Sequence, residues 1–150
     1  MNHKTLFVVL IAGLATSMTL FCVQGQAQSS RPDLSGKWKL IEGDTGANSP
    51  LGKEGSMSQD GTSVTFQSLK VPFDGTTNTR DESVYIREYE GQWIGKAFVV
   101  SMKARTGTTP ANFTDLMIVS LAPDDGMTMV IMHTTMTGKT NTYTLKYRKS

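Results

Sequence analysis

The chain has 150 residues, and its 15 lysines and arginines against 13 acidic residues give a net charge of +2. Charges of both signs are scattered along it, and no basic stripe suggests a nucleic acid or an anionic membrane surface as a partner. We therefore expect no nucleic-acid partner, and the charge favours no other class of partner.

Residues 1–27 predict an export signal and not a part of the fold. Lys4 supplies a positive start, and the run from Leu6 to Leu14 is apolar and free of charge. Gly25-Gln26-Ala27 then places small residues two apart, as a signal peptidase requires. This composition is typical of a secretory signal peptide that is cleaved near Ala27.

Two alternatives to simple cleavage follow from the same segment. Apolar residues resume at Met18 to Val23, so the segment could instead be a retained N-terminal anchor. Cys22 raises the question of a lipoprotein, but the bulky Phe21 before it disfavours that modification. Cleavage removes the only cysteine, so residues 28–150 are predicted to form one domain without an internal disulfide. We expect this domain to be periplasmic or secreted.

Regular structure is predicted to begin at Ser35–Glu42, where Trp38 and Leu40 alternate with lysines. This period of two is typical of a strand with one buried face. Gly36 leaves room for a neighbouring backbone or for the indole of Trp38. The stretch is therefore predicted to be the first strand.

Turn-forming residues divide the rest of the chain into short strands. Glu42–Lys53 and Thr76–Glu82 are predicted to be polar loops, and Asp60-Gly61 predicts a hairpin. No amphipathic helix is predicted anywhere in residues 28–150. The predicted strands are residues 35–42, 56–59, 62–67, 69–73, 83–90, 97–103, 116–119, 127–136 and 140–148. Their spacing predicts an all-β fold, a small up-and-down antiparallel barrel of about eight strands.

A family resemblance supports this architecture. Ser35-Gly36-Lys37-Trp38-Lys39-Leu40 resembles the Gly-x-Trp opening strand of the calycins, the lipocalins and fatty-acid-binding proteins. The chain from residue 28 onward is similar to exported bacterial lipocalin-like proteins of unassigned function. The other matching segments are Ser56 to Gly61, Phe73-Asp74-Gly75, Trp93-Ile94-Gly95 and Tyr147-Arg148-Lys149. The resemblance implies a lipocalin-like barrel in which Arg148 packs across Trp38, although strict alternation puts Arg148 on the opposite face unless the strand bulges.

The groups that most enzymes need are sparse in residues 28–150. His133 is the only histidine there, and neither a cysteine nor a second histidine can join it as a metal ligand. No nucleophile motif accompanies it. Glu88 and Glu90 share one face of a strand, which is typical of a solvated outer face. We expect no enzymatic activity, no catalytic residue, no metal and no cofactor.

One face of the predicted strands gathers an apolar wall of the kind that lines small-molecule sites. Its predicted ligand-binding residues are Phe66, Ile86, Phe98, Met117, Met129 and Tyr143, and Val64, Val84 and Val100 complete the wall. An eight-stranded barrel is either just filled by its own side chains or just able to hold one ligand. The leading hypothesis is an exported, non-enzymatic barrel that binds a small apolar or amphipathic molecule.

Residues 116–121 and 127–133 are apolar on both faces, whereas a closed barrel buries only its inner face. This pattern predicts a homodimer through these strands, or a loop folded over them. The alternative function is therefore a protein-interaction module, an inhibitor or an assembly factor, that acts through its loops or an apolar sheet face. Methionines cluster in the same segments, where they either fill an irregular core or line an adaptable cavity.

Overall fold

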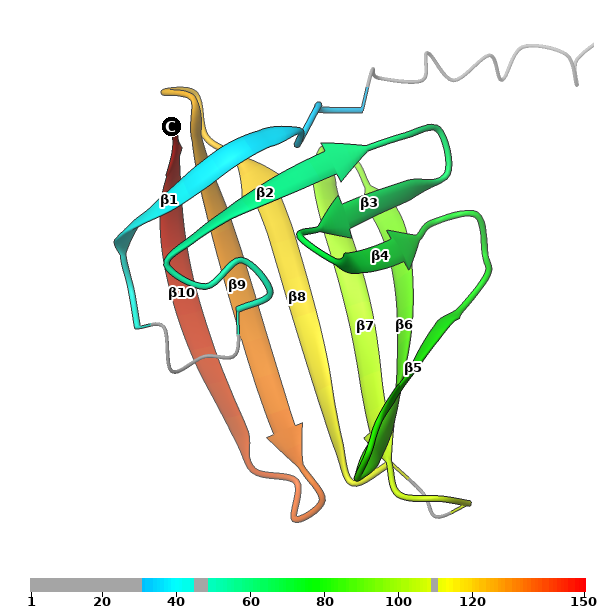
Figure 1. Cartoon of the computed structure of the whole chain (residues 1–150). Coiled ribbons are helices and arrows are strands. Elements are labelled where there is room, and N and C mark those ends of the chain that lie inside the picture. Colours follow the sequence, from blue (N-terminus) through cyan, green and yellow to red (C-terminus); the bar gives the residue numbers. More distant parts are fainter. Residues whose placement is uncertain (1–30, 45–48, 109–110) are drawn as a thin grey trace, which may run out of the picture. The chain divides into compact units, whose positions relative to one another are not determined.

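The computed structural model describes residues 31–44, 49–108 and 111–150, which form ten antiparallel β-strands in one sheet (Figure 1). The strands are β1 (Gly36–Glu42), β2 (Glu54–Gln59), β3 (Ser63–Phe66), β4 (Leu69–Pro72), β5 (Asn78–Glu82), β6 (Tyr85–Ile94), β7 (Ala97–Arg105), β8 (Phe113–Leu121), β9 (Gly126–Thr135) and β10 (Thr140–Lys149). In the described part of the chain, no helix is long and apolar enough to cross a membrane. The predicted signal peptide and its cleavage site lie outside the described residues.

The predicted number of about eight strands is wrong, because a polar segment also forms a strand. β5 lies inside Thr76–Glu82, which was predicted to be a loop, and it pairs with β6 from Asn78↔Tyr89 to Glu82↔Tyr85. Its side chains lack apolar alternation because one face is solvated and the other lines a polar part of the interior. Ser83, with a φ of 56°, makes the tight turn between the two strands.

The strands follow one another as a meander, and β1 returns to pair with β10. The sheet order therefore runs β4-β3-β2-β1-β10-β9-β8-β7-β6-β5, and no backbone ladder joins β4 to β5. Side chains bridge this seam instead. Asn78 donates from Nδ2 to the carbonyl of Lys70, and the ring of Phe73 meets those of Trp93 and Phe98 at centroid distances of 6.4 and 6.0 Å. The result is a nearly closed barrel.

The two halves of the meander differ in strand length. β1 to β4 have seven, six, four and four residues, whereas β6 to β10 have nine or ten. In Figure 1 the short strands cross in front of one end of the long strands, and the other end extends beyond them. The long strands therefore carry an inner face that the short strands cover only in part.

Trp38 anchors the covered end. Its indole is 1% exposed, and Nε1 donates to the carbonyl of Leu34 at 3.0 Å. The basic side chain over the ring is Lys149, whose Nζ lies 5.6 Å from the ring centroid. The implied packing of Arg148 across Trp38 is therefore wrong: Arg148 pairs in register with Lys39, and both side chains are exposed. The side chains of β10 thus alternate between the two faces of the sheet, so Lys149 and not Arg148 lies on the face of Trp38.

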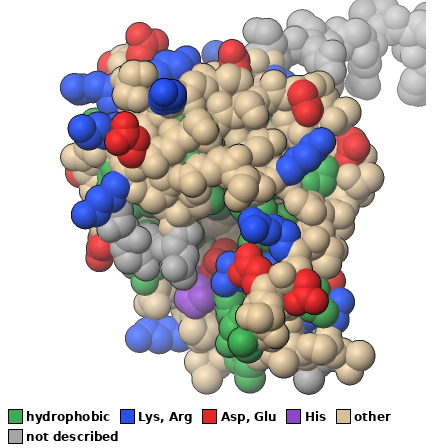
Figure 2. Space-filling model, in the orientation of Figure 1, with side chains coloured by type: hydrophobic (Ala, Val, Ile, Leu, Met, Phe, Trp, Pro, Cys, Tyr) green, Lys and Arg blue, Asp and Glu red, His purple; other side chains and the backbone are tan. Residues whose placement is uncertain are grey.

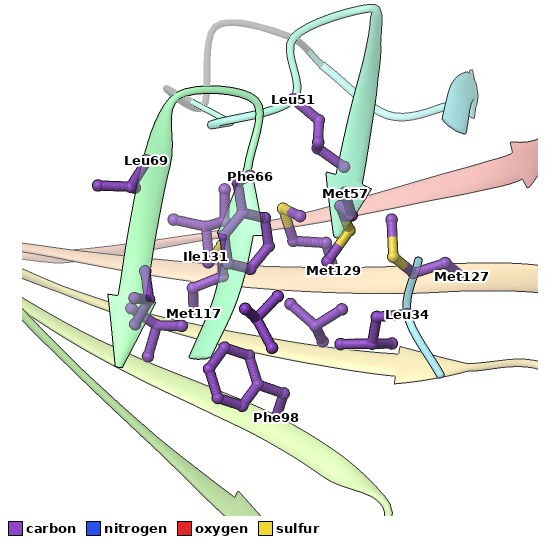
Figure 3. Packing of buried hydrophobic residues seen from close by; sticks show 14 of the residues in the cluster. Leu34, Leu51, Met57, Phe66, Leu69, Phe98, Met117, Met127, Met129 and Ile131 are labelled. Carbon is purple, nitrogen blue, oxygen red and sulfur yellow. The ribbon is translucent and has the colours of Figure 1, made fainter. Parts of the chain in front are cut away.

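The core consists of the inward side chains of both halves (Figure 3). Phe66 from β3 stacks on Phe98 from β7 with ring centroids 6.3 Å apart. The methionines on inward positions are buried, namely Met57, Met102, Met117, Met127 and Met129. Met136, beyond the end of β9, is 72% exposed. Met57, Met127 and Met129 thus fill the core, as one of the two interpretations held.

The long strands also carry an apolar row on their outer face. Ile118 on β8 is paired in register with Val99 on β7 and Val130 on β9, and Leu116 is paired with Met132. Leu116 is 36% exposed, and Ile118, Val130 and Met132 are half-buried. No described loop is hydrogen-bonded across this row.

Candidate ligand-binding site

A pocket of about 350 Å³ lies on the inner side of the barrel. Its walls come from the loop before β2, the β3–β4 turn, and β5 to β9. The lining residues are Ser49, Pro50, Phe66, Gln67, Ser68, Leu69, Arg80, Glu82, Arg87, Tyr89, Val100, Met102, Phe113, Asp115, Met117 and Ile131. In Figure 2, cationic and acidic side chains gather side by side below the short front strands. The pocket therefore joins an apolar part to a charged part.

The apolar part follows from strand alternation. Val100 and Met102 on β7, Met117 on β8 and Ile131 on β9 all point inward, and cross-strand register places Val100↔Met117↔Ile131 in one row. Phe66 from β3 faces this row from the short strands (Figure 3). Apolar side chains with a few polar groups are the usual make-up of a small-molecule site.

The charged part lies on β5 and β6. Arg80 and Arg87 are direct cross-strand partners, and both line the pocket. Glu82, two residues along β5, forms an ion pair with Arg87, with Oε2 3.0 Å from Nη1. The Nε of Arg87 is buried and has no hydrogen-bond partner among the described residues. Glu88, the next acid on β6, faces outward and pairs with Arg105 at 3.2 Å.

A second polar pair lies on β8 and β9. Asp115 and His133 are cross-strand partners, and Oδ1 of Asp115 is 2.5 Å from Nδ1 of His133. The imidazole also lies near the ring of Phe113, at a centroid distance of 5.3 Å, and Phe113 meets Tyr85 at 5.5 Å. The carboxylate of Asp115 is thus already occupied by a neighbour.

Tyr147 fixes the loop that supplies Ser49 and Pro50 to the pocket. Its hydroxyl donates to the carbonyl of Gly52 at 2.9 Å and lies 2.7 Å from Oγ of Ser49. Burial raises the pKa of the phenol, while the hydrogen bond with Ser49 opposes this shift. The loop is therefore tied to β10 by groups that are neutral at physiological pH.

The structure brings two of the six predicted site residues to the pocket, Phe66 and Met117. Phe98 and Met129 are both 0% exposed and belong to the core, and Tyr143 packs half-buried against that core. Ile86 lies on the opposite face of β6 from Arg87 and Tyr89, so its predicted place on the inner wall is wrong. Val84 is 62% exposed in the β5–β6 turn. The roles of the six in binding remain predictions.

Sequence reasoning missed the charged residues of the site. Arg87 lies between Tyr85 and Tyr89 in β6, and an aromatic-flanked arginine on one face was a usable signal for an inner, polar wall. Arg80 carried no such signal, because its position depends on the pairing of β5 with β6.

No group of three or more histidine, cysteine, aspartate or glutamate side chains that could hold a metal ion occurs among residues 31–44, 49–108 and 111–150. The expectation of a protein without enzymatic activity or cofactor stays a prediction.

No protein-family model matches the sequence, and no curated protein matches it either. Among solved structures, the chain is similar to a secretory abundant heat soluble (SAHS) protein from Ramazzottius varieornatus, crystallised from a dimer sample. The TM-score is 0.52 at 12% sequence identity, over 78% of this chain and 95% of that chain. At this identity the likeness concerns the fold alone. It supports an all-β, nearly closed antiparallel barrel.

Proposed function

We propose that this protein is an exported, non-enzymatic barrel that binds one small apolar or amphipathic molecule in the pocket between β3, β5 and the inner face of β6 to β9. The pocket carries the proposal. Its volume of about 350 Å³ falls near the lower end of the ~300–1,000 Å³ that is typical of ligand sites. Export rests on the predicted signal peptide in residues 1–27.

The apolar row Val100, Met117 and Ile131 supports an apolar body for the ligand, because burial of such a body against these side chains is favourable. The polar lining supports a polar or charged group at one end of the ligand, which these side chains would orient.

The test is a titration with the neutral apolar dye Nile red, followed by its fluorescence. Met117→Trp places a larger side chain in the pocket and is expected to weaken binding about tenfold or more, since overfilling such a space costs about 1–3 kcal/mol. Leu116→Trp is the matched control, because it adds the same side chain to the outer face of the same strand. Binding by the parent that survives Leu116→Trp but not Met117→Trp supports the proposal. Absence of saturable binding, or equal loss in both variants, contradicts it.

A second candidate function is an interaction module that pairs through the outer face of β8 and β9. The row Leu116, Ile118, Val130 and Met132 supports it, since apolar outer faces mark contact surfaces more often than isolated apolar residues do. Sedimentation velocity tests this candidate. A dimer that Ile118→Lys dissociates supports a homodimer through this face, and a monomer at all concentrations speaks against it.

A further inference from the structure

We propose that Arg80 and Arg87 form an anion-recognition site at the charged end of the pocket, so that the natural ligand is an amphipathic anion. The inference rests on the proposed function and deepens it. It names the chemical class of the ligand: an apolar body that carries one carboxylate or phosphate group.

The first argument is the cross-strand pairing of two cations. Arg80 and Arg87 are direct partners in the β5–β6 ladder, and both side chains line the pocket. Like charges directly opposite one another destabilise a sheet. Local features that destabilise a fold are expected mainly at functional sites. The inward-facing pair of arginines therefore marks the charged end of the pocket as a candidate binding site.

The second argument is the distribution of the nearby negative charges. Glu82 is the only described carboxylate that forms an ion pair with either arginine, and its oxygen contacts Arg87. Asp115 is occupied by His133, and Glu88 faces the other side of the sheet with Arg105. The guanidinium of Arg80 makes no ion pair and no hydrogen bond with the described residues, although its side chain is only partly exposed. The pocket lining holds two arginines and two carboxylates, but among the described residues the guanidinium of Arg80 has no direct partner.

The third argument is the buried Nε of Arg87. It has no partner among the described residues, while Nη1 of the same group is held by Glu82. A buried donor without a partner is uncommon in folded proteins and requires an explanation. An anion between the two guanidinium groups would supply acceptors to Arg80 and to the free donors of Arg87, because arginine forks bind carboxylate and phosphate oxygens in pairs.

The experiment varies the head group on one apolar tail. Isothermal titration calorimetry of the full chain compares decanoate, decyl phosphate, decanol and decyltrimethylammonium, each kept below its micelle concentration. We expect both anions to bind at least about tenfold more tightly than decanol, because a charge-assisted contact in a partly solvated site is worth roughly one order of magnitude. The cation is expected to bind most weakly. The order of the two anions decides between a carboxylate and a phosphate.

Variants of single arginines distinguish anion binding at this site from a general attraction of anions to positive charge on the protein. Arg80→Gln is expected to weaken anion binding about tenfold relative to decanol binding, and Arg80→Lys is expected to restore part of the loss. Arg148→Gln is the matched control, because it removes the same charge from the exposed outer face of β10. Near-ultraviolet circular dichroism of each variant checks the fold.

The possible failures are distinguishable. Equal affinity of the parent for decanoate, decyl phosphate and decanol, or equal effects of Arg80→Gln and Arg148→Gln, would overturn the anion site and leave the proposed binding function in place. Absence of binding by all four amphiphiles would overturn the binding function and the anion site together.

Discussion

Replacement of Trp38 by alanine tests the packing that holds the short strands onto the long ones. The indole is 1% exposed, it donates to the carbonyl of Leu34, and Lys149 lies over its ring. Loss of the buried ring and the cavity left behind cost about 3–5 kcal/mol. The unpaired carbonyl of Leu34 adds about 1 kcal/mol. We therefore expect Trp38→Ala to lower the free energy of unfolding by about 4–6 kcal/mol, a large share of the ~5–15 kcal/mol typical of a domain.

Urea denaturation followed by far-ultraviolet circular dichroism measures this loss. The free energies of the two proteins can be compared if the slope of the unfolding free energy against urea concentration is the same in both. Trp38→Phe keeps most of the buried area but loses the donor to Leu34, so a smaller loss of about 1–3 kcal/mol is expected and keeps the test useful if the alanine variant does not fold. Trp93→Ala is the control, because that indole is half-buried and its Nε1 has no partner among the described residues. A loss below about 1 kcal/mol for Trp38→Ala, or one no larger than that of Trp93→Ala, would refute the role of Trp38 as the anchor.

Two further predictions concern close packing and pH. Gly91→Ala is expected to destabilise the protein by about 1–3 kcal/mol in the same assay, because an added Cβ would lie 2.6 Å from the ring of Phe98 and 2.8 Å from the carbonyl of Pro72. A neutral effect would contradict the close packing of β4 against β6 at this residue. Asp60 accepts hydrogen bonds from the amide of Thr62 and the hydroxyl of Ser63, which lower its pKa to about 2. Because this pKa is below its unfolded value, the contribution of Asp60 is present above about pH 4 and is lost as the pH falls toward 2. Asp60→Asn should therefore flatten the decrease in stability between pH 4 and 2, and an unchanged acid profile would contradict this assignment.

Much of the fold could be predicted from the sequence, because turns and alternation are local. The Asp60-Gly61 hairpin, the alternation of Trp38 and Leu40, and the apolar strands around Val100 and Met117 carry their own signals. β5 could not be predicted in this way, since a polar strand is recognised only by its pairing partner. The strand count was wrong for this reason.

The candidate site was harder to predict, because it depends on which face of a strand points inward. In β6 one face carries Ile86 and the other carries Tyr85 and Tyr89, so hydrophobicity alone did not choose between them, and Ile86 was assigned to the wrong face. Phe98 and Met129 were correctly expected to point inward, but whether an inward side chain lines a pocket or fills the core depends on packing between distant strands. Arg80 reaches the pocket only through the register of β5 with β6.

The most direct test of ligand binding in this pocket uses methionine methyl groups as reporters in nuclear magnetic resonance. Met102 and Met117 line the pocket, whereas Met132 lies on the outer face and Met136 is exposed. Titration of methyl-labelled protein with decanoate is predicted to shift the Met102 and Met117 resonances in a saturable way and to leave those of Met132 and Met136 in place. Shifts confined to Met132 and Met136, or no saturable shift at any methionine, would contradict a ligand site inside the barrel.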